Sequence, residues 1–126
     1  MLNIPTFVIL TFLYIFANMY HRRSSMNYEW DQAKNLSNIR KHKVSFEQAV
    51  MALEDPYRLC LYDETHSLNE DRYIVFGNAE RLILFVSIVW IDEDTIRIIS
   101  ARRASMKEME TYSENSSLFL GKRTQA

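Results

Sequence analysis

The chain has 126 residues, 48% of them apolar and 25% charged, which suits one folded domain and excludes a disordered or low-complexity segment. Its one cysteine, Cys60, excludes an internal disulfide and a cysteine-based zinc site, and it fits a reducing compartment. Two glycines leave no glycine-rich phosphate loop, and a net charge of −1 means that any site for a polyanion must be a local patch.

The first 25 residues differ from the rest of the chain. Residues 2–20 carry no charged side chain, and as a helix they would measure about 28 Å, close to the thickness of a membrane's hydrocarbon core. Arg22 and Arg23 follow, as expected at the cytoplasmic end of an anchor. The segment could instead be upstream sequence, read in frame from a start codon ahead of Met26. A secretion signal fits less well, because no basic residue precedes the apolar stretch. Residues 1–25 are therefore an apolar leader of either origin.

Two helices are expected next. Asp31 can cap the first, which runs to about His42, and His42 itself suits a cation at the helix end. Its buried face is predicted to be an apolar stripe of Trp30, Ala33, Leu36 and Ile39. Ser45 and Gln48 form a capping box that opens the second helix, which ends near residue 53 because Pro56 cannot continue it.

The pattern then changes to that of strands. Four are predicted, over residues 57–62, 72–76, 82–90 and 95–101. The third is almost unbroken apolar sequence, typical of a strand in the middle of a sheet. Residues 77–80 (GNAE) indicate the hairpin turn before it, and the acidic residues 92–94 the turn after it. Cys60 is expected in the core, among the apolar residues of the first strand.

A second capping box, Ser105 with Glu108, predicts a short terminal helix to about Tyr112. Residues 114–126 are expected to form a flexible tail, so that the folded domain covers residues 26–113. This order of elements predicts the α+β class, with two N-terminal helices, a four-stranded antiparallel sheet and a short C-terminal helix.

Basic residues gather in two segments that contain no acidic one. The first holds Lys34, Arg40, Lys41 and Lys43, and the second holds Arg97, Arg102, Arg103 and Lys107. If the first helix lies beside the end of the last strand, the two segments form one face able to hold phosphates. The alternative is that the helix cations only face solvent and pair with neighbouring acids.

Arg102 and Arg103 are the most concentrated positive charge. They stand at the end of a strand, directly before a helix N-terminus that adds its own partial positive charge. Two adjacent guanidinium groups repel each other unless an anion lies between them. The sequence leaves two partners open, a phosphate or a structural ion pair with Glu70 or Asp71. Strict alternation along this strand would place Arg97, Ile99 and Ala101 on one face and Ile96, Ile98 and Ser100 on the other.

The polar loop over residues 63–72 (DETHSLNEDR) combines His66, Glu70 and Arg72. Histidine exchanges a proton near neutral pH, a carboxylate can orient it or act as a base, and arginine can stabilise a phosphorane. Metal-free RNA cleavage, in which the 2′-hydroxyl attacks its own phosphate, needs these groups. Two alternatives stay open: an inert polar surface, and a metal site of His66 with Asp63 and Glu64.

Taken in order, these motifs resemble the BrnT family, the toxin half of a type II toxin–antitoxin pair with a RelE-like ribonuclease fold. The matching blocks are Tyr28-Glu29-Trp30-Asp31 with Lys34 and Asn38, residues 40–49 (RKHKVSFEQA), Asp55-Pro56, His66-Ser67, residues 70–73 (EDRY) and residues 97–104 (RIISARRA). They run from about Met26 to Tyr112, and family members commonly start at residues 26–28 in this numbering, which favours the early start codon. One departure is Lys43, where the family often has glycine at a left-handed helix end, so strain is expected there.

The resemblance implies a small ribonuclease that cleaves cellular RNA and arrests growth. It also implies that a BrnA-type antitoxin silences the toxin and carries the DNA-binding part, so that only the complex binds operator DNA and represses the operon. By position, the activity residues would be Glu47, Arg72, Arg102 and Arg103, with His66 and Glu70 as further candidates.

The main hypothesis is a cytoplasmic endoribonuclease toxin that needs no metal or other cofactor. Arg102 and Arg103 would bind the scissile phosphate, Arg72 would assist, Glu47 or Glu70 would be the base and His66 the acid. Lys34, Arg40 and Lys41 would bind flanking phosphates. The alternative is a non-catalytic module that uses the same face for an acidic partner or nucleic acid, which suits the 13 basic against 16 acidic residues from Met26 on. A third hypothesis is a membrane-anchored protein with its C-terminal domain in the cytoplasm.

Overall fold

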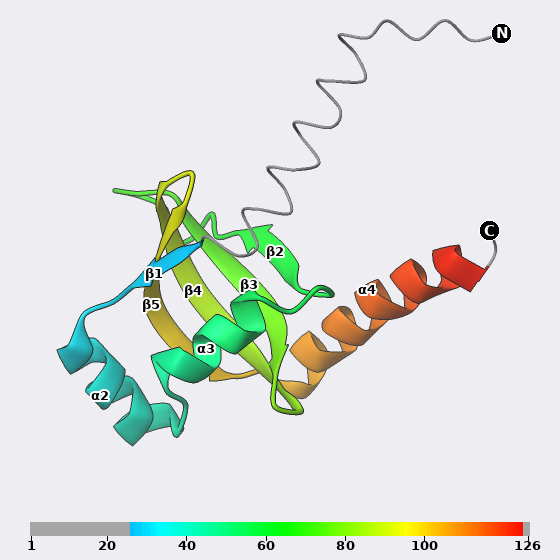
Figure 1. Cartoon of the computed structure of the whole chain (residues 1–126), viewed down its shortest axis with the longest axis horizontal. Helices are drawn as coiled ribbons and strands as arrows, with labels where there is room; N and C mark the ends of the chain where they lie inside the picture. Colours follow the sequence, from blue (N-terminus) through cyan, green and yellow to red (C-terminus); the bar gives the residue numbers. More distant parts are fainter. Residues whose placement is uncertain (1–25, 125–126) are drawn as a thin grey trace, which may run out of the picture.

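Five strands and three helices make up residues 26–124, the part of the chain that the structure, a computed structural model, describes (Figure 1). In chain order they are β1 (Asn27–Glu29), α2 (Gln32–His42), α3 (Phe46–Leu53), β2 (Leu59–Tyr62), β3 (Arg72–Ala79), β4 (Leu82–Asp92), β5 (Thr95–Arg103) and α4 (Met106–Thr124). The apolar leader predicted over residues 1–25 lies outside the described residues. Within the described part, no helix combines the length and the apolar character needed to cross a membrane.

The strands form one mixed sheet in the order β1-β5-β4-β3-β2. The pairs between β2 and β5 are antiparallel, whereas β1 runs parallel to β5, with Glu29 opposite Arg97. The predicted four-stranded antiparallel sheet behind two leading helices is therefore wrong, because a fifth strand precedes the helices. A strand of three residues shows no period, and the partner of Glu29 lies 68 positions further along the chain, so no local pattern reveals this pairing.

Both predicted helix starts are confirmed. Asp31 accepts hydrogen bonds from the N–H groups of Ala33 at 2.8 Å and Lys34 at 3.2 Å. Ser45 and Gln48 form the expected reciprocal capping box at the start of α3. After α2, Lys43 has a φ of 59°, the left-handed conformation for which strain was expected.

The buried face of α2 is not the predicted apolar stripe. Leu36 and Ile39 are 49% and 36% exposed, whereas Asn35 and Asn38 are buried. Asn38 donates to the carbonyl of Ala101 at 2.7 Å and accepts from its N–H at 3.1 Å, as a neighbouring strand would. β1 pairs only with the first three residues of β5, so this amide satisfies backbone groups further along the same edge. The prediction failed because it assumed an apolar neighbour, and the neighbour is a strand edge.

The core lies between α3 and one face of the sheet. Its members include Val44, Phe46, Ala49, Ala52, Val75, Leu84, Val86, Ile88, Ile98 and Ala101. A Cβ atom on Gly77 would lie 2.1 Å from the carbonyl oxygen of Ala52, so the close approach of α3 to β3 requires glycine there. Gly77 thus belongs to β3, so the predicted hairpin is confirmed but its turn comes later than residues 77–80 suggested. The hairpin turns at Glu80 and Arg81, with φ values of 49° and 73°.

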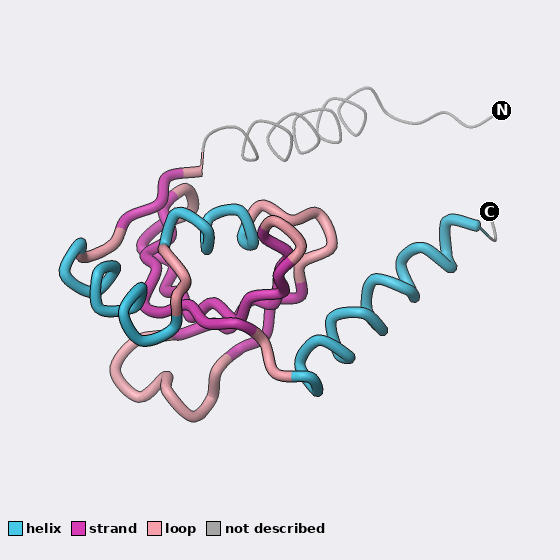
Figure 2. Tube along the Cα trace, turned by 90° about the horizontal axis from the view of Figure 1, so that it is seen from below, coloured by secondary structure: helices cyan, strands magenta, loops and turns pink. Residues whose placement is uncertain are grey.

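α4 is longer than predicted. Its capping box is confirmed, since the N–H of Glu108 donates to the Ser105 hydroxyl at 3.2 Å and the N–H of Ser105 donates to the Glu108 carboxylate at 2.7 Å. The helix does not end near Tyr112 but runs to Thr124 and projects from the sheet (Figures 1 and 2). Once a helix has nucleated, each further residue adds a hydrogen bond, and no proline or glycine interrupts α4 before Gly121.

The buried Asp55 carboxylate joins α4 to the loop before β2 and to the end of β3. The hydroxyl of Tyr112 donates to the buried Asp55 carboxylate at 2.5 Å, and that carboxylate also accepts the N–H groups of Tyr57 and Asn78. Burial and this bond to Asp55 raise the pKa of Tyr112 to about 12.

Cys60 is exposed on the edge strand β2, so its predicted core position is wrong. Apolar neighbours in the sequence do not reveal that a strand lies at the edge of a sheet.

Candidate functional site

The two faces of the sheet differ in what covers them. α2 and α3 cover one face, and the loop between β2 and β3 lies on the other side (Figure 2). We call this other side the back face. The register places three rows of side chains on it: Arg72, Val89 and Arg97; Ile74, Ser87 and Ser100; Phe76, Phe85 and Arg102. Arginine therefore stands in the first and last rows of the back face, with small and apolar side chains between.

A β-bulge decides which arginines share this face. Ser87 pairs with Ser100, but Ile88 pairs with Ile98, so Ile99 has no opposite residue on β4. Strict alternation along β5 therefore fails after Ile98, and Arg102 comes to lie on the face of Arg97. Arg103 pairs with the core residue Leu84 and is directed to the opposite face. The sheet thus separates Arg102 from Arg103.

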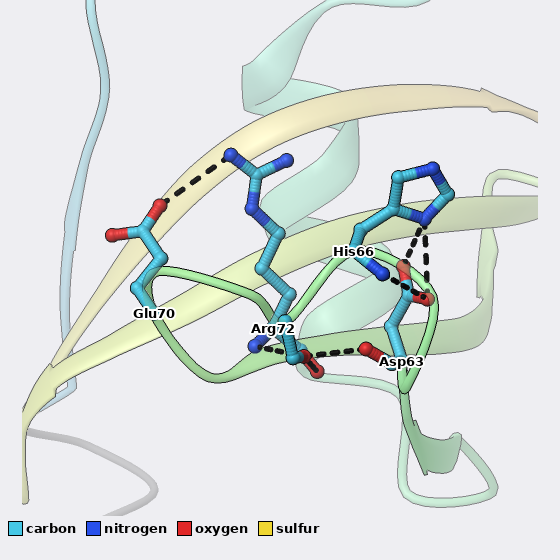
Figure 3. A network of polar contacts seen from close by, with 5 residues as sticks. Asp63, His66, Glu70 and Arg72 are labelled. Carbon is cyan, nitrogen blue, oxygen red and sulfur yellow. Dashed lines mark hydrogen bonds and ion pairs between the residues drawn. The ribbon is translucent and has the colours of Figure 1, made fainter.

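The loop between β2 and β3 holds a carboxylate–imidazole pair (Figure 3). The buried Asp63 accepts hydrogen bonds from Nδ1 of His66 at 2.9 Å and from its backbone N–H at 3.3 Å. Because an ionised carboxylate only accepts, Nδ1 carries the hydrogen, and Nε2 has no partner among the described residues. The His66 side chain is 65% exposed. Asp63 therefore orients a histidine whose second nitrogen a substrate can reach.

Ser67 closes this loop at its base. Its hydroxyl donates to the carbonyl of Asp63 and accepts from the N–H of Arg72 at 3.0 Å. The N–H of Asp63 in turn donates to the carbonyl of Arg72 at 2.9 Å. These bonds set the position of the Asp63–His66 pair relative to the first residue of β3.

Arg72 lies beside that pair and is only partly neutralised. Its Nη2 is 3.4 Å from the carboxylate of Glu70, and its Nε is buried without a hydrogen-bond acceptor in the described part of the chain. The side chains of Arg72 and His66 point to the same side of the loop (Figure 3). Three predicted site residues, His66, Glu70 and Arg72, are therefore brought together.

Arg102 has a different partner from those that the sequence left open. Its guanidinium makes two bonds to the carboxylate of Glu108, at 2.8 and 3.0 Å, and stacks 3.9 Å above the ring of Phe85. Hydrogen bonding to Arg102 lowers the pKa of Glu108. The alternative of a bridge from Arg102 to Glu70 or Asp71 is wrong, because Glu70 pairs with Arg72 and Asp71 accepts from the Tyr62 hydroxyl.

Arg102 and the loop lie at different places on the back face. Arg72 pairs with Val89 and Arg102 pairs with Phe85, four positions along β4, which corresponds to roughly 13 Å. The expected convergence of the loop with both terminal arginines on one anion does not occur. Arg102 and Arg72 can only contact separate groups of an extended ligand.

The remaining predicted residues lie on the helical side of the sheet. Glu47 is exposed in the first turn of α3, 3.4 Å from the Asn35 amide. Lys34, Arg40 and Lys41 are exposed on α2. The bonds between Asn38 and Ala101 place α2 beside the end of β5, as the merged basic face requires.

Several residues with structural or chemical roles escaped the sequence analysis. Asn35 and Asn38 anchor α2, and Asp63, considered from the sequence only as a metal ligand, orients His66. A polar pair at the (i, i+3) spacing of Asn35 and Asn38 was the available signal for the helix face. Among the described residues, no group of three His, Cys, Asp or Glu side chains is arranged to hold a metal ion.

Comparison with known proteins gives a family and a structural likeness. A family model described as the ribonuclease toxin BrnT of the type II toxin–antitoxin system matches residues 30–108. The crystal structure of the Brucella abortus ribonuclease toxin BrnT is similar to this chain, with 25% sequence identity and a TM-score of 0.49, over 64% of this chain and 99% of that one. The search of curated proteins gives no match.

Proposed function

Because the chain belongs to the BrnT family of ribonuclease toxins of type II toxin–antitoxin systems, we propose that it cleaves cellular RNA in the cytoplasm, without a metal ion, and so arrests growth. The observation that carries this proposal is the Asp63–His66 pair beside Arg72 on an exposed loop. An oriented imidazole next to a guanidinium supplies proton transfer and charge stabilisation at one phosphate.

The reaction joins the 2′-oxygen of a nucleotide to its own phosphorus and breaks the bond to the 5′-oxygen of the next nucleotide. The phosphate first displaces the Glu70 carboxylate from Arg72. The freed carboxylate then takes the proton of the 2′-hydroxyl. Arg72 stabilises the extra negative charge of the phosphorane. His66, protonated before the reaction, gives a proton to the leaving 5′-oxygen through Nε2. The products are a 2′,3′-cyclic phosphate and a 5′-hydroxyl end.

The other predicted residues act on the rest of the strand. Arg102 binds a further phosphate along the back face, in exchange for its bond to Glu108. Arg103, Lys34, Arg40 and Lys41 hold flanking phosphates on the edge of the molecule next to α2. Glu47 lies on the helical side of the sheet, whereas Glu70 lies beside Arg72 in the loop, which favours Glu70 as the base.

A type II toxin has a protein antitoxin as its partner. For this chain we propose a BrnA-type antitoxin, which also carries the complex to operator DNA. The exposed apolar side chains of Leu36 and Ile39, among the cations of α2, support a protein partner there, because α2 itself leaves them uncovered. An antitoxin bound at α2 would also cover Arg40 and Lys41 and so keep RNA away.

The test is RNA cleavage by the purified full chain in EDTA. We expect cyclic-phosphate ends, and a rate that His66→Gln lowers roughly 10²- to 10⁴-fold, the usual contribution of a general acid. His42→Gln, which alters an exposed histidine on α2, is the matched control and should leave the rate unchanged. In cells, induction should arrest growth, and co-expression of the antitoxin should relieve it.

Two outcomes would contradict the proposal. Cleavage that stops in EDTA would show a metal-dependent reaction. Binding of RNA with no cleavage by the unaltered chain would favour the non-catalytic module instead.

A further inference from the structure

We propose that Arg97 is the second arginine of the scissile-phosphate site, acting with Arg72, an inference that rests on the ribonuclease function proposed above. Arg97 lies in β5, the same strand as Arg102 and Arg103, the pair that the sequence analysis emphasised. Its position relative to the loop follows only from the register of the sheet.

The register puts Arg72 and Arg97 in one row. Both are opposite Val89 of the central strand β4, one from β3 and one from β5. Two strand spacings separate them, so their Cα atoms are about 10 Å apart, on the same face. Side chains as long as arginine can reach one phosphate from both sides across that gap.

The residue between the two arginines in this row is apolar. Val89, which is opposite both arginines, is buried. The Nε of Arg72 is buried and has no acceptor among the described residues. A phosphate oxygen would supply one, and its negative charge would be attracted by both cations.

Each arginine is now held by an exposed carboxylate. Glu29 bonds Arg97 at 2.8 Å and is 44% exposed, and Glu70 bonds Arg72 at 3.4 Å and is 43% exposed. Exposed ion pairs contribute little to stability, so a phosphate dianion or diester can displace them at small cost. The two glutamates therefore occupy the places that phosphate oxygens would take.

The alternative arginines are less suited to share a phosphate with Arg72. Arg103 is directed to the opposite face, and Arg102 stands four positions away along β4 in a two-bond pair with Glu108. Arg97 is also at the end of the sheet from which the His66 loop emerges, since Arg72 begins β3. The row of Arg72 and Arg97 is thus the one arginine pair of the described residues that is adjacent to His66 on the back face.

The experiment measures binding of a 2′-O-methyl RNA oligonucleotide, which cannot be cleaved, to the full chain across a range of salt concentrations. Arg97→Gln should weaken binding about tenfold and lower the slope of log affinity against log salt by about 1, as expected for one lost phosphate contact. Glu29→Gln should tighten binding, because it removes the competing carboxylate. Cleavage of unmodified RNA by Arg97→Gln should fall further than binding does.

Matched controls come from the turn between β3 and β4. Arg81→Gln and Glu80→Gln make the same charge changes at exposed positions just past Ala79, the end of β3, which lies seven positions and roughly 23 Å from Arg72. Loss of the Arg97–Glu29 pair as such cannot explain the expected result, because Glu29→Gln breaks the same pair and shifts binding the other way. Thermal unfolding of Arg97→Gln and Glu29→Gln checks that β1 stays paired with β5.

Three results would overturn the inference. They are equal binding by Arg97→Gln and Arg81→Gln, weaker binding by Glu29→Gln, and no measurable binding by the unaltered chain. A chain that binds with the expected pattern but cleaves nothing would leave the phosphate site standing and refute the ribonuclease proposal alone.

Discussion

Lys43 has a backbone conformation that its own side chain disfavours. Its φ of 59° is left-handed, yet its N–H still donates to the Ile39 carbonyl at 2.9 Å and closes the end of α2. A residue with a Cβ atom pays roughly 1–2 kcal/mol for that conformation, whereas glycine adopts it freely. The position is therefore strained for lysine and suited to glycine.

We expect Lys43→Gly to raise the free energy of unfolding by about 1 kcal/mol, with part of the gain offset by the greater entropy of glycine in the unfolded chain. Urea unfolding followed by circular dichroism measures the change. Lys41→Gly, within α2, is the control and should lower stability by about 1 kcal/mol. If both variants are destabilised alike, the strain at Lys43 is not real.

At the scale of elements, the contact between α3 and β3 depends on the missing side chain of Gly77. Its Cα lies so near the carbonyl of Ala52 that a methyl group cannot fit without moving the helix away from the sheet. Ala49, Ala52 and Phe46 of α3 fill the core, so such a shift would open space beneath them.

Gly77→Ala should therefore cost roughly 1–3 kcal/mol of stability, the usual range for overpacking a well-filled core. Asn78→Ala, on the next and exposed residue, keeps the backbone N–H that Asp55 accepts and should change stability by no more than about 0.5 kcal/mol. The midpoint of chemical unfolding distinguishes the two. A harmless Gly77→Ala would mean that α3 can shift without loss.

At the scale of the whole molecule, the pair of Arg102 with Glu108 joins the sheet to α4 and makes stability depend on pH. The pKa of Glu108 is lowered in the folded chain by its bonds to Arg102, so the contribution is present above the ordinary value of 4.5. It is lost as pH falls below 4.5 through the folded pKa, because the protonated acid no longer holds the guanidinium.

Glu108→Gln should accordingly lower the melting temperature at pH 7 and have a smaller effect at pH 3, where the glutamate of the unaltered chain is itself losing its charge. Glu110→Gln, two positions along the same helix and exposed, should show no such trend. A difference between the two variants that stays constant from pH 7 to pH 3 would contradict the assignment.

Sequence predicted those parts of the fold that depend on neighbours in the chain. The caps at Asp31, Ser45 and Ser105 involve bonds over two or three residues, and all three are observed. The fifth strand, the burial of Asn35 and Asn38, and the exposure of Cys60 depend on partners far away in sequence. Periodicity describes one element at a time and contains no information about its lateral neighbours.

The candidate site divides in the same way. The loop over residues 63–72 is a local unit, and His66, Glu70 and Arg72 are indeed neighbours. The arginines of β5 are separated by a single extra residue, Ile99, which the alternation of apolar residues does not reveal. One bulge thus exchanged Arg103 for Arg102 on the back face and left Arg97 in line with Arg72.

The side-chain amide of Asn38 has a consequence for the behaviour of the protein in concentrated solution. The unpaired backbone groups of an edge strand can bond to a strand of another copy, which is how sheets grow into fibrils. Asn38 bonds both backbone groups of Ala101 on the edge of β5. Because its partner there is a side-chain amide and not a strand, the sheet cannot be extended through these groups. Strand addition at Ala101, beyond the three residues of β5 that β1 covers, would first have to break these two bonds.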